Sequence, residues 1–441
     1  MNNSKFNNIQ ISLSAVSHFI TDIYQSFIVG LIPILVGKFE LSLFKVSLLT
    51  ATSVIANSLF SPVFGYFSDR HGLKYFLVSG PLMTSIFLSL IGILPNYYLL
   101  LTFLFIGNLG IAAYHPASAA IAGHFGGQKK GIGSSIINFG GNFGNALGVL
   151  LIILIAERIN INLTPIAMIP GILMAIIILK LVPNKPSWSI DPIYKSQDQN
   201  YKSSYYNYNN ANNNNSHIYK RNSAENYSIK RNYFINQTGY KSSRFFTKVI
   251  NFDKRNFSIL LLIMLSIYAL YILWITMVTY MPLYYRRDRI TLIDVGIIMF
   301  LFGGLGGAGG LISGYLFDRF KKGNFIIQAG FILAVPLFYL MYRTPVAVSM
   351  ILFILGGIFL ISVQPVCIRL TQDLLPKNMS FASSLILGFS PGIAGITMIF
   401  LGKAADRIGI VRLVNYELIF AVVISLVLFS YLPIEKKINK K

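Results

Sequence analysis

Long apolar runs, separated by short polar segments, dominate the chain. An α-helix needs about 20 mainly apolar residues to cross a hydrocarbon core ~30 Å thick. The runs predict spans near residues 11–37, 47–67, 75–94, 98–123, 132–156, 165–182, 257–281, 293–316, 325–342, 346–366, 380–402 and 413–432. The first run contains Ser, His and Asp, so we expect a retained span and not a secretory signal. The pattern therefore predicts an all-α polytopic membrane protein with twelve transmembrane helices.

A segment of different composition separates the two groups of six predicted spans. Residues 183–256 are rich in Asn, Tyr, Ser, Lys and Arg and have almost no aliphatic periodicity. Such a segment cannot bury enough apolar surface to offset its ordering entropy, so we expect it to be disordered. The predicted domains are an N-terminal six-helix bundle (1–182), a basic cytoplasmic linker (183–256) and a C-terminal six-helix bundle (257–441).

A sequence repeat relates the two groups of spans. At one offset of 249 residues, six sites match: Pro33 and Pro282, Gly65 and Gly314, Asp69–Arg70 and Asp318–Arg319, Pro116 and Pro365, Ser134–Ser135 and Ser383–Ser384, and Glu157–Arg158 and Asp406–Arg407. A common offset predicts two six-helix pseudo-repeats. In transporters built from such repeats, the substrate site lies between them near the bilayer midplane.

The charge of the chain predicts its orientation. Only 12% of the residues are charged, about half the fraction of a soluble domain, yet 37 Lys and Arg against 15 Asp and Glu give a net charge of +22. With both termini in the cytoplasm, 27 of these 37 cations face inward, in agreement with the positive-inside rule. We therefore interpret the excess as a cytoplasmic surface near anionic lipid, and not as a nucleic-acid-binding surface.

Three polar residues within the predicted spans are candidates for proton coupling. By this assignment Asp22 is the only acidic residue deep within a span, where an ionised carboxylate costs roughly 2.5–3.5 kcal/mol. His18 lies one helical turn earlier on the same face, and His115 lies at a similar depth in the fourth span. The pair of His18 and Asp22 could load and release a proton, because a histidine titrates near neutrality. The alternative is a static polar clamp within the first bundle.

The polar loop after the second span carries a recognisable motif. It reads GYFSDRHGLKY from Gly65 to Tyr75, and the loop after the eighth span repeats it in part as GYLFDRFKKGNF. This resembles the G-x-L-x-D-R-x-G-R-K signature of the major facilitator superfamily, although Leu73 stands where the family often has Arg. The candidate conformational latch consists of Gly65, Asp69, Arg70, Gly72, Lys74, Gly314, Asp318 and Arg319. The alternative is a solvated cytoplasmic turn.

The fifth span is rich in glycine. Gly140, Gly144 and Gly148 recur every four residues, beside Gly141, and present one smooth face for helix packing. The run is similar to the antiporter motif of drug exporters in this superfamily, with Asn142 where that motif commonly has proline. Packing alone would also explain the glycines.

The first and fourth spans look like the fosmidomycin-resistance branch of the superfamily. They read SHFITDIYQSFIVGLIPIL and AYHPASAAIAGHFGGQKKGIGSS. The resemblance implies the major facilitator fold, in which spans 1, 4, 7 and 10 line a central cavity. It would place His18, Asp22 and His115 on that cavity. Candidate substrate contacts from spans 7 and 10 are Tyr268, Tyr271, Trp274 and Gln364, although aromatic residues at these spacings also serve as packing or interfacial anchors.

These features predict a secondary active transporter that works by alternating access. We expect proton-coupled export of a small organic compound or drug from a bacterial cell, by a monomer in the plasma membrane. The alternatives are a proton-coupled importer or facilitator and a receptor that does not transport.

The sequence has no glycine-rich phosphate loop with its lysine and no clustered Cys and His set, and Cys367 is its single cysteine. We therefore expect no enzyme activity, cofactor or metal site.

Overall fold

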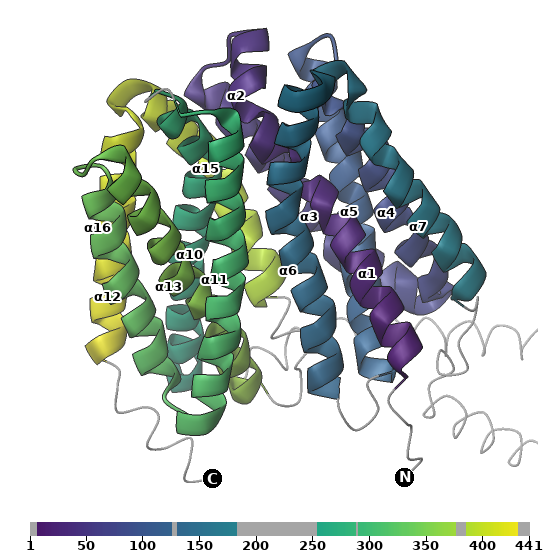
Figure 1. Cartoon of the computed structure of the whole chain (residues 1–441). Helices are drawn as coiled ribbons and strands as arrows, with labels where there is room; N and C mark the ends of the chain where they lie inside the picture. The colour runs from purple at the N-terminus through teal and green to yellow at the C-terminus, as the bar shows by residue number, and fades with distance from the viewer. Residues whose placement is uncertain (1–6, 126–129, 183–253, 288–289, 376–384, 431–441) are drawn as a thin grey trace, which may run out of the picture. The chain divides into compact units, whose positions relative to one another are not determined.

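Helices make up the whole of the described structure. The computed structural model describes residues 7–125, 130–182, 254–287, 290–375 and 385–430 (Figure 1). The first half contains α1 (Asn8–Gln25), α2 (Phe27–Phe39), α3 (Leu43–His71), α4 (Leu73–Ser89), η1 (Leu90–Gly92), α5 (Tyr97–Phe125), α6 (Lys130–Leu154), η3 (Ile155–Asn160), η4 (Ile161–Ala167) and α7 (Met168–Leu181). The second half contains α10 (Lys254–Arg287), α11 (Leu292–Phe320), α12 (Gly323–Met341), α13 (Val346–Leu374), η5 (Leu385–Phe389), α15 (Ser390–Ile408) and α16 (Ile410–Ser430). The all-α prediction is confirmed for this part of the chain.

The predicted spans fall on these helices, with one difference in how they are joined. Within the described ranges, 11 helical stretches are long and apolar enough to cross a membrane. The fifth and sixth predicted spans lie in one stretch of 46 residues, Ile136–Leu181, because the π-helical turn η3 and the 3-10 turn η4 connect α6 to α7. The twelve predicted spans therefore correspond to eleven uninterrupted stretches.

One compact unit contains residues 1–185 and 261–441. Within it, the most extensive contacts between helices of the two halves are those of α3 with α15 and of α6 with α11. The described residues leave out 183–253, so the predicted disorder of the linker falls almost entirely outside them. The division into two six-helix bundles stays a prediction.

The helices α1 and α6 touch backbone to backbone, as the two adjacent ribbons in Figure 1 indicate. A Cβ atom added to any of three α6 glycines would collide with a carbonyl oxygen of α1. The pairs are Gly140 with Ala15, Gly144 with Phe19, and Gly148 with Ile23. Because both sets of residues recur every four positions, the glycines fix the register of α1 on α6. This contact positions the polar residues of α1.

The two halves are also joined by hydrogen bonds at the start of α3. The Asp406 carboxylate, near the end of α15, accepts the backbone N–H groups of Leu43 and Phe44 at 2.7 and 3.1 Å. From α10, the hydroxyl of Tyr280 donates to the Leu43 carbonyl at 3.3 Å. The first N–H groups of a helix have no partner within that helix, so an acidic side chain can satisfy them. These bonds hold the two halves together at this end of α3.

Candidate functional site

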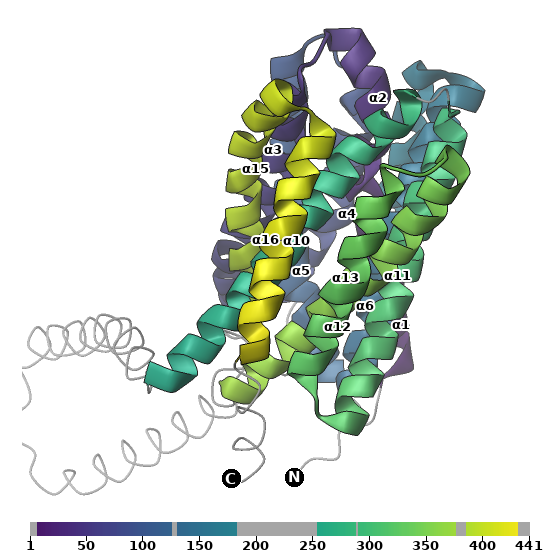
Figure 2. The same ribbon diagram turned by 90° about the vertical axis from the view of Figure 1, so that its left-hand side faces the viewer.

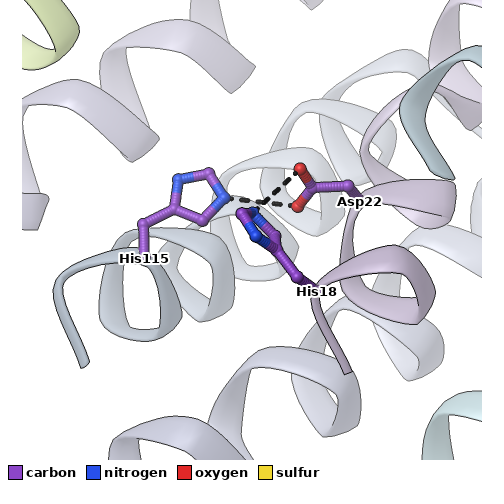
Figure 3. Close-up of side chains that lie close together, drawn as sticks. All are labelled: His18, Asp22 and His115. Carbon is purple, nitrogen blue, oxygen red and sulfur yellow. Dashed lines mark hydrogen bonds and ion pairs between the residues drawn. The ribbon is translucent and has the colours of Figure 1, made fainter. Parts of the chain in front are cut away.

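The three predicted proton-coupling residues meet between α1 and α5. Asp22 lies between two imidazoles: His18 Nε2 is 3.3 Å from Asp22 Oδ2, and His115 Nε2 is 3.2 Å from Asp22 Oδ1 (Figure 3). The rings of His18 and His115 stand edge to face, with centroids 5.1 Å apart. Both carboxylate oxygens therefore have a nitrogen partner that can carry a proton.

Burial within this cluster is uneven. Asp22 is 7% exposed and His18 is 9% exposed, whereas 32% of the His115 side chain is accessible. A carboxylate withdrawn from water in a membrane span needs either a proton or a cationic partner. His115 is therefore the member of the cluster that is most accessible from its surroundings.

Gly141 of α6 closes the third side of the cluster. A Cβ atom at this position would lie 2.7 Å from His18 Nε2 and 2.8 Å from Asp22 Oδ2, distances that are too short for a carbon atom. The absence of a side chain at Gly141 therefore lets α6 approach the imidazole and the carboxylate. From the sequence this glycine was interpreted as a packing residue only.

The second half holds a neutral counterpart of the Asp22–His115 pair. At the 249-residue offset, Tyr271 matches Asp22 and Gln364 matches His115. The Gln364 side-chain amide donates to the Tyr271 hydroxyl at 2.8 Å, which joins α13 to α10 as His115 joins α5 to α1. The repeat thus preserves the contact but replaces the titrating pair by groups that keep their charge state near neutral pH.

The other candidate substrate contacts lie on α10. The rings of Tyr271 and Trp274 stand edge to face at 6.5 Å, so the structure brings Tyr271, Trp274 and Gln364 together. The Tyr268 hydroxyl instead shares a hydrogen bond of 2.9 Å with Thr397 of α15. Each of these four side chains is partly exposed.

The residues of the candidate latch are only partly described. Gly72 ends α3 with a positive φ of 98°, which favours glycine, and a Cβ at Gly65 would lie 3.3 Å from Pro116 of α5. In the second loop Asp318 pairs with Lys321 at 3.4 Å, within its own turn. Arg319 lies near Tyr315, partly exposed Lys74 follows Gly72 in α4, and Gly314 faces open space. The side chains of Asp69 and Arg70 lie outside the described residues.

The expectation that Asp22 alone is an acid deep within a span is wrong. Glu417 lies in α16 and is 5% exposed. The predicted span began at residue 413 and placed Glu417 at a helix end, but α16 begins at Ile410, which places Glu417 further inside. The sequence signal for this residue is a single glutamate within an otherwise apolar run.

The His18, Asp22 and His115 cluster also has the spacing of a possible cation site, which the sequence did not indicate. Its three ligand atoms all lie within 4.8 Å of one another, and two imidazoles with one carboxylate form a donor set that zinc accepts. The same nitrogen and oxygen atoms also lie close enough to share protons in hydrogen bonds. A divalent cation and protons would therefore compete for the same atoms.

The chain is similar to known proteins over nearly its whole length. The family model described as Major Facilitator Superfamily matches residues 14–390. The fosmidomycin resistance protein of Escherichia coli (strain K12) is 23% identical over 424 residues, which cover 95% of this chain and 90% of that protein.

Two solved structures are similar to this chain in fold. One is a bacterial homologue of the human lysosomal transporter Spinster, in an inward-facing and unoccupied conformation, with a TM-score of 0.72, 14% identity and 98% of each chain covered. The other is a D-xylose-proton symporter, with a TM-score of 0.65, 16% identity, and 95% of this chain and 96% of that chain covered. At these identities the likeness concerns the fold alone.

Proposed function

As the chain belongs to the Major Facilitator Superfamily, we propose that it exports a small organic compound by alternating access, in exchange for protons. The membership confirms the family and the fold class predicted from the sequence. The chain is a multi-pass membrane transporter and not an enzyme. Proton exchange is the further step, and the buried Asp22 carboxylate between two imidazoles is the observation that carries it.

The proposed cycle follows from the unequal exposure of the cluster. Protonation of Asp22 removes the charge of a buried carboxylate, and loss of that proton leaves a negative charge that a protonated His18 or His115 can balance. Partly exposed His115 exchanges protons with water, whereas buried His18 tunes Asp22. Because these states differ in charge inside a low-dielectric bundle, they can favour different conformations of the transporter.

Export is favoured over import by two observations. The chain is similar in sequence to a protein named for fosmidomycin resistance, and the glycine face of α6 resembles the motif of drug exporters. Proton-coupled import, as by the symporter of similar fold, is the second candidate. A receptor without transport is the third.

The remaining assignments belong to the same proposal. Tyr268, Tyr271, Trp274 and Gln364 contact substrate from the second half, and the two loop motifs latch one conformation. The protein acts as a monomer in a bacterial plasma membrane, with both termini and the linker 183–256 in the cytoplasm.

Transport in proteoliposomes under an imposed pH gradient tests the proposal. A panel of antibiotics that includes fosmidomycin, together with sugars and organic anions, is assayed with the wild type, Asp22→Asn and the exposed control Asp373→Asn, whose carboxylate pairs with Arg369 of the same helix. The wild type and the control should transport one compound uphill against proton flux. Asp22→Asn should lose uphill transport and keep exchange of substrate for substrate.

Uphill transport at the wild-type rate by Asp22→Asn would refute proton coupling at this site. Proton flux in the same direction as substrate would indicate import. Absence of counterflow in the wild type for every compound would favour the receptor.

A further inference from the structure

The carboxyl group of Glu417 in α16 has one satisfied oxygen and one orphaned oxygen. The Thr276 hydroxyl of α10 donates to Glu417 Oε1 at 2.8 Å. The other oxygen, Oε2, is buried and has no hydrogen-bond partner. An ionised carboxylate needs donors at both oxygens, whereas a protonated carboxyl leaves one neutral O–H without a partner, which costs less than a buried charge without one. The geometry around Glu417 suits the neutral acid.

No cation balances Glu417 in the described part of the chain. No Lys, Arg or His there forms an ion pair with it. The helix α16, yellow in Figure 2, packs on α12 and α15. Of these helices α12 carries no charged residue, and the charged side chains of α15 are exposed near its end: Lys403, Asp406 and Arg407. On α16 itself Arg412 is exposed, as is Arg286 at the end of α10.

The remaining titratable groups near Glu417 are phenols. Tyr280 of α10 and Tyr342, which follows α12, are close enough to interact electrostatically with its carboxylate. Phenols are neutral near pH 7 and cannot balance a negative charge. Leaving a buried charge without a partner is costly, so these surroundings favour the protonated form of Glu417.

The helix α10, whose Thr276 donates to Glu417, also contacts the first half of the protein within one turn of Thr276. Thr279 of α10 donates to the Thr50 hydroxyl of α3 at 3.1 Å, and Tyr280 donates to the Leu43 carbonyl. Thr276, Thr279 and Tyr280 are spaced by three and four residues, which places them on neighbouring positions of the helix surface. Separation of α3 from α10 would therefore admit water close to the Glu417 carboxyl.

We propose that Glu417 is a second proton-binding site, which keeps its proton while α3 and α10 are in contact and releases it to water when they part. The O–H bond of the carboxylic acid breaks, the proton goes to a water molecule, and the carboxylate keeps the Thr276 hydrogen bond while water solvates Oε2. The proposal rests on the alternating-access cycle proposed above. It adds to that cycle a proton site in the second half, where the repeat has replaced Asp22 by Tyr271.

Infrared spectroscopy of the full-length protein in lipid tests the proposal directly. Spectra are recorded across a pH series, and the carbonyl band of a protonated carboxyl group is assigned to Glu417 by its loss in Glu417→Gln. Asp22→Asn is the matched control and should keep this band. The readout does not depend on transport, so a failure of proton coupling at Asp22 would leave the Glu417 result intact.

Two opposite perturbations then test the link to the α3–α10 contact. A disulfide between Thr50→Cys and Thr279→Cys, in a Cys367→Ala background, closes the contact, and the same sample after reduction is its own control. Asp406→Ala, which removes the cap of α3 described above, weakens the contact. The band should persist to higher pH, by at least one pH unit, in the oxidised protein, and it should be lost at lower pH in Asp406→Ala. An unchanged titration under both perturbations would overturn the proposal. So would a Glu417→Gln spectrum with the same carboxylic-acid bands as the wild type at neutral pH. If the disulfide does not form, the Asp406→Ala titration alone decides.

Discussion

Asp406 Oδ1 accepts the backbone N–H of Leu43 at 2.7 Å, so a side chain of the second half caps a helix of the first. The second carboxylate oxygen accepts the N–H of Phe44 at 3.1 Å. The first N–H groups of a helix have no partner within that helix, and an acidic side chain at this end is also favoured by the helix dipole. The bond therefore favours the conformation in which α3 and α15 are closed at this end.

Asp406→Ala should shift the conformational equilibrium toward the open state. Loss of a helix cap costs about 1 kcal/mol, which corresponds to a population shift of about fivefold. The readout is the rate at which a maleimide labels Thr50→Cys, buried in the closed state, in a Cys367→Ala background. Asp373→Asn, whose carboxylate pairs with Arg369 of its own helix, should leave the rate unchanged. Equal labelling in both variants would show that the cap does not govern closure.

Gly141→Ala should disrupt the polar cluster more than the fold. The new methyl group would lie 2.7 Å from His18 Nε2 and 2.8 Å from Asp22 Oδ2, so these side chains must move. Overpacking of this kind costs about 1–3 kcal/mol, and we expect proton-driven transport to fall at least about tenfold. The matched control is Gly37→Ala, because a Cβ there meets nothing within 4 Å. Thermal unfolding measured on both variants separates a loss of function from a loss of stability, and normal transport by Gly141→Ala would contradict the prediction.

His18→Gln should destabilise the protein, and Asp22→Asn should reverse part of the loss. Removing one buried partner leaves the Asp22 carboxylate with only His115, and breaking a buried pair costs about 3–5 kcal/mol. The double variant carries no uncompensated charge and should unfold at a higher temperature than His18→Gln alone. Thermal unfolding of the wild type, the two single variants and the double variant measures the coupling. Additive effects would mean that His18 does not balance Asp22.

Tyr271→Phe should affect substrate binding without affecting proton stoichiometry. The variant removes the hydroxyl that accepts from Gln364, and neither group changes its charge near neutral pH. We expect a severalfold higher apparent KM, with an unchanged ratio of protons to substrate in a flux assay on proteoliposomes. A changed ratio would make Tyr271 itself part of proton coupling, and an unchanged KM would remove Tyr271 from the substrate site.

Much of the fold could be predicted because the membrane imposes simple rules on sequence. A run of about 20 apolar residues is long enough to span, and this rule located the helices even where the turn at 155–167 continues the helical path. The 249-residue repeat relates the two halves from the sequence alone. Boundaries were less certain, and an error of three residues at the start of α16 concealed Glu417.

The candidate site was only partly predictable, because hydropathy shows that a side chain lies in the membrane but not which groups face it. A polar residue within an apolar run indicated Asp22 and His18. The close approach of Gly141 to these two side chains and the pairing of Gln364 with Tyr271 depend on helix packing in three dimensions. Hydropathy contains no information of that kind.

The glycine contact between α1 and α6 has a consequence for how the proton site can work. Carbonyl oxygens of Ala15, Phe19 and Ile23 rest directly on Gly140, Gly144 and Gly148, so α1 can neither slide nor rotate on α6 without a backbone collision. The contact therefore favours movement of the two helices as one body that carries Asp22 with it. In the cycle proposed above, the acid then stays still relative to α6, and the side of the membrane from which water can reach it is what changes.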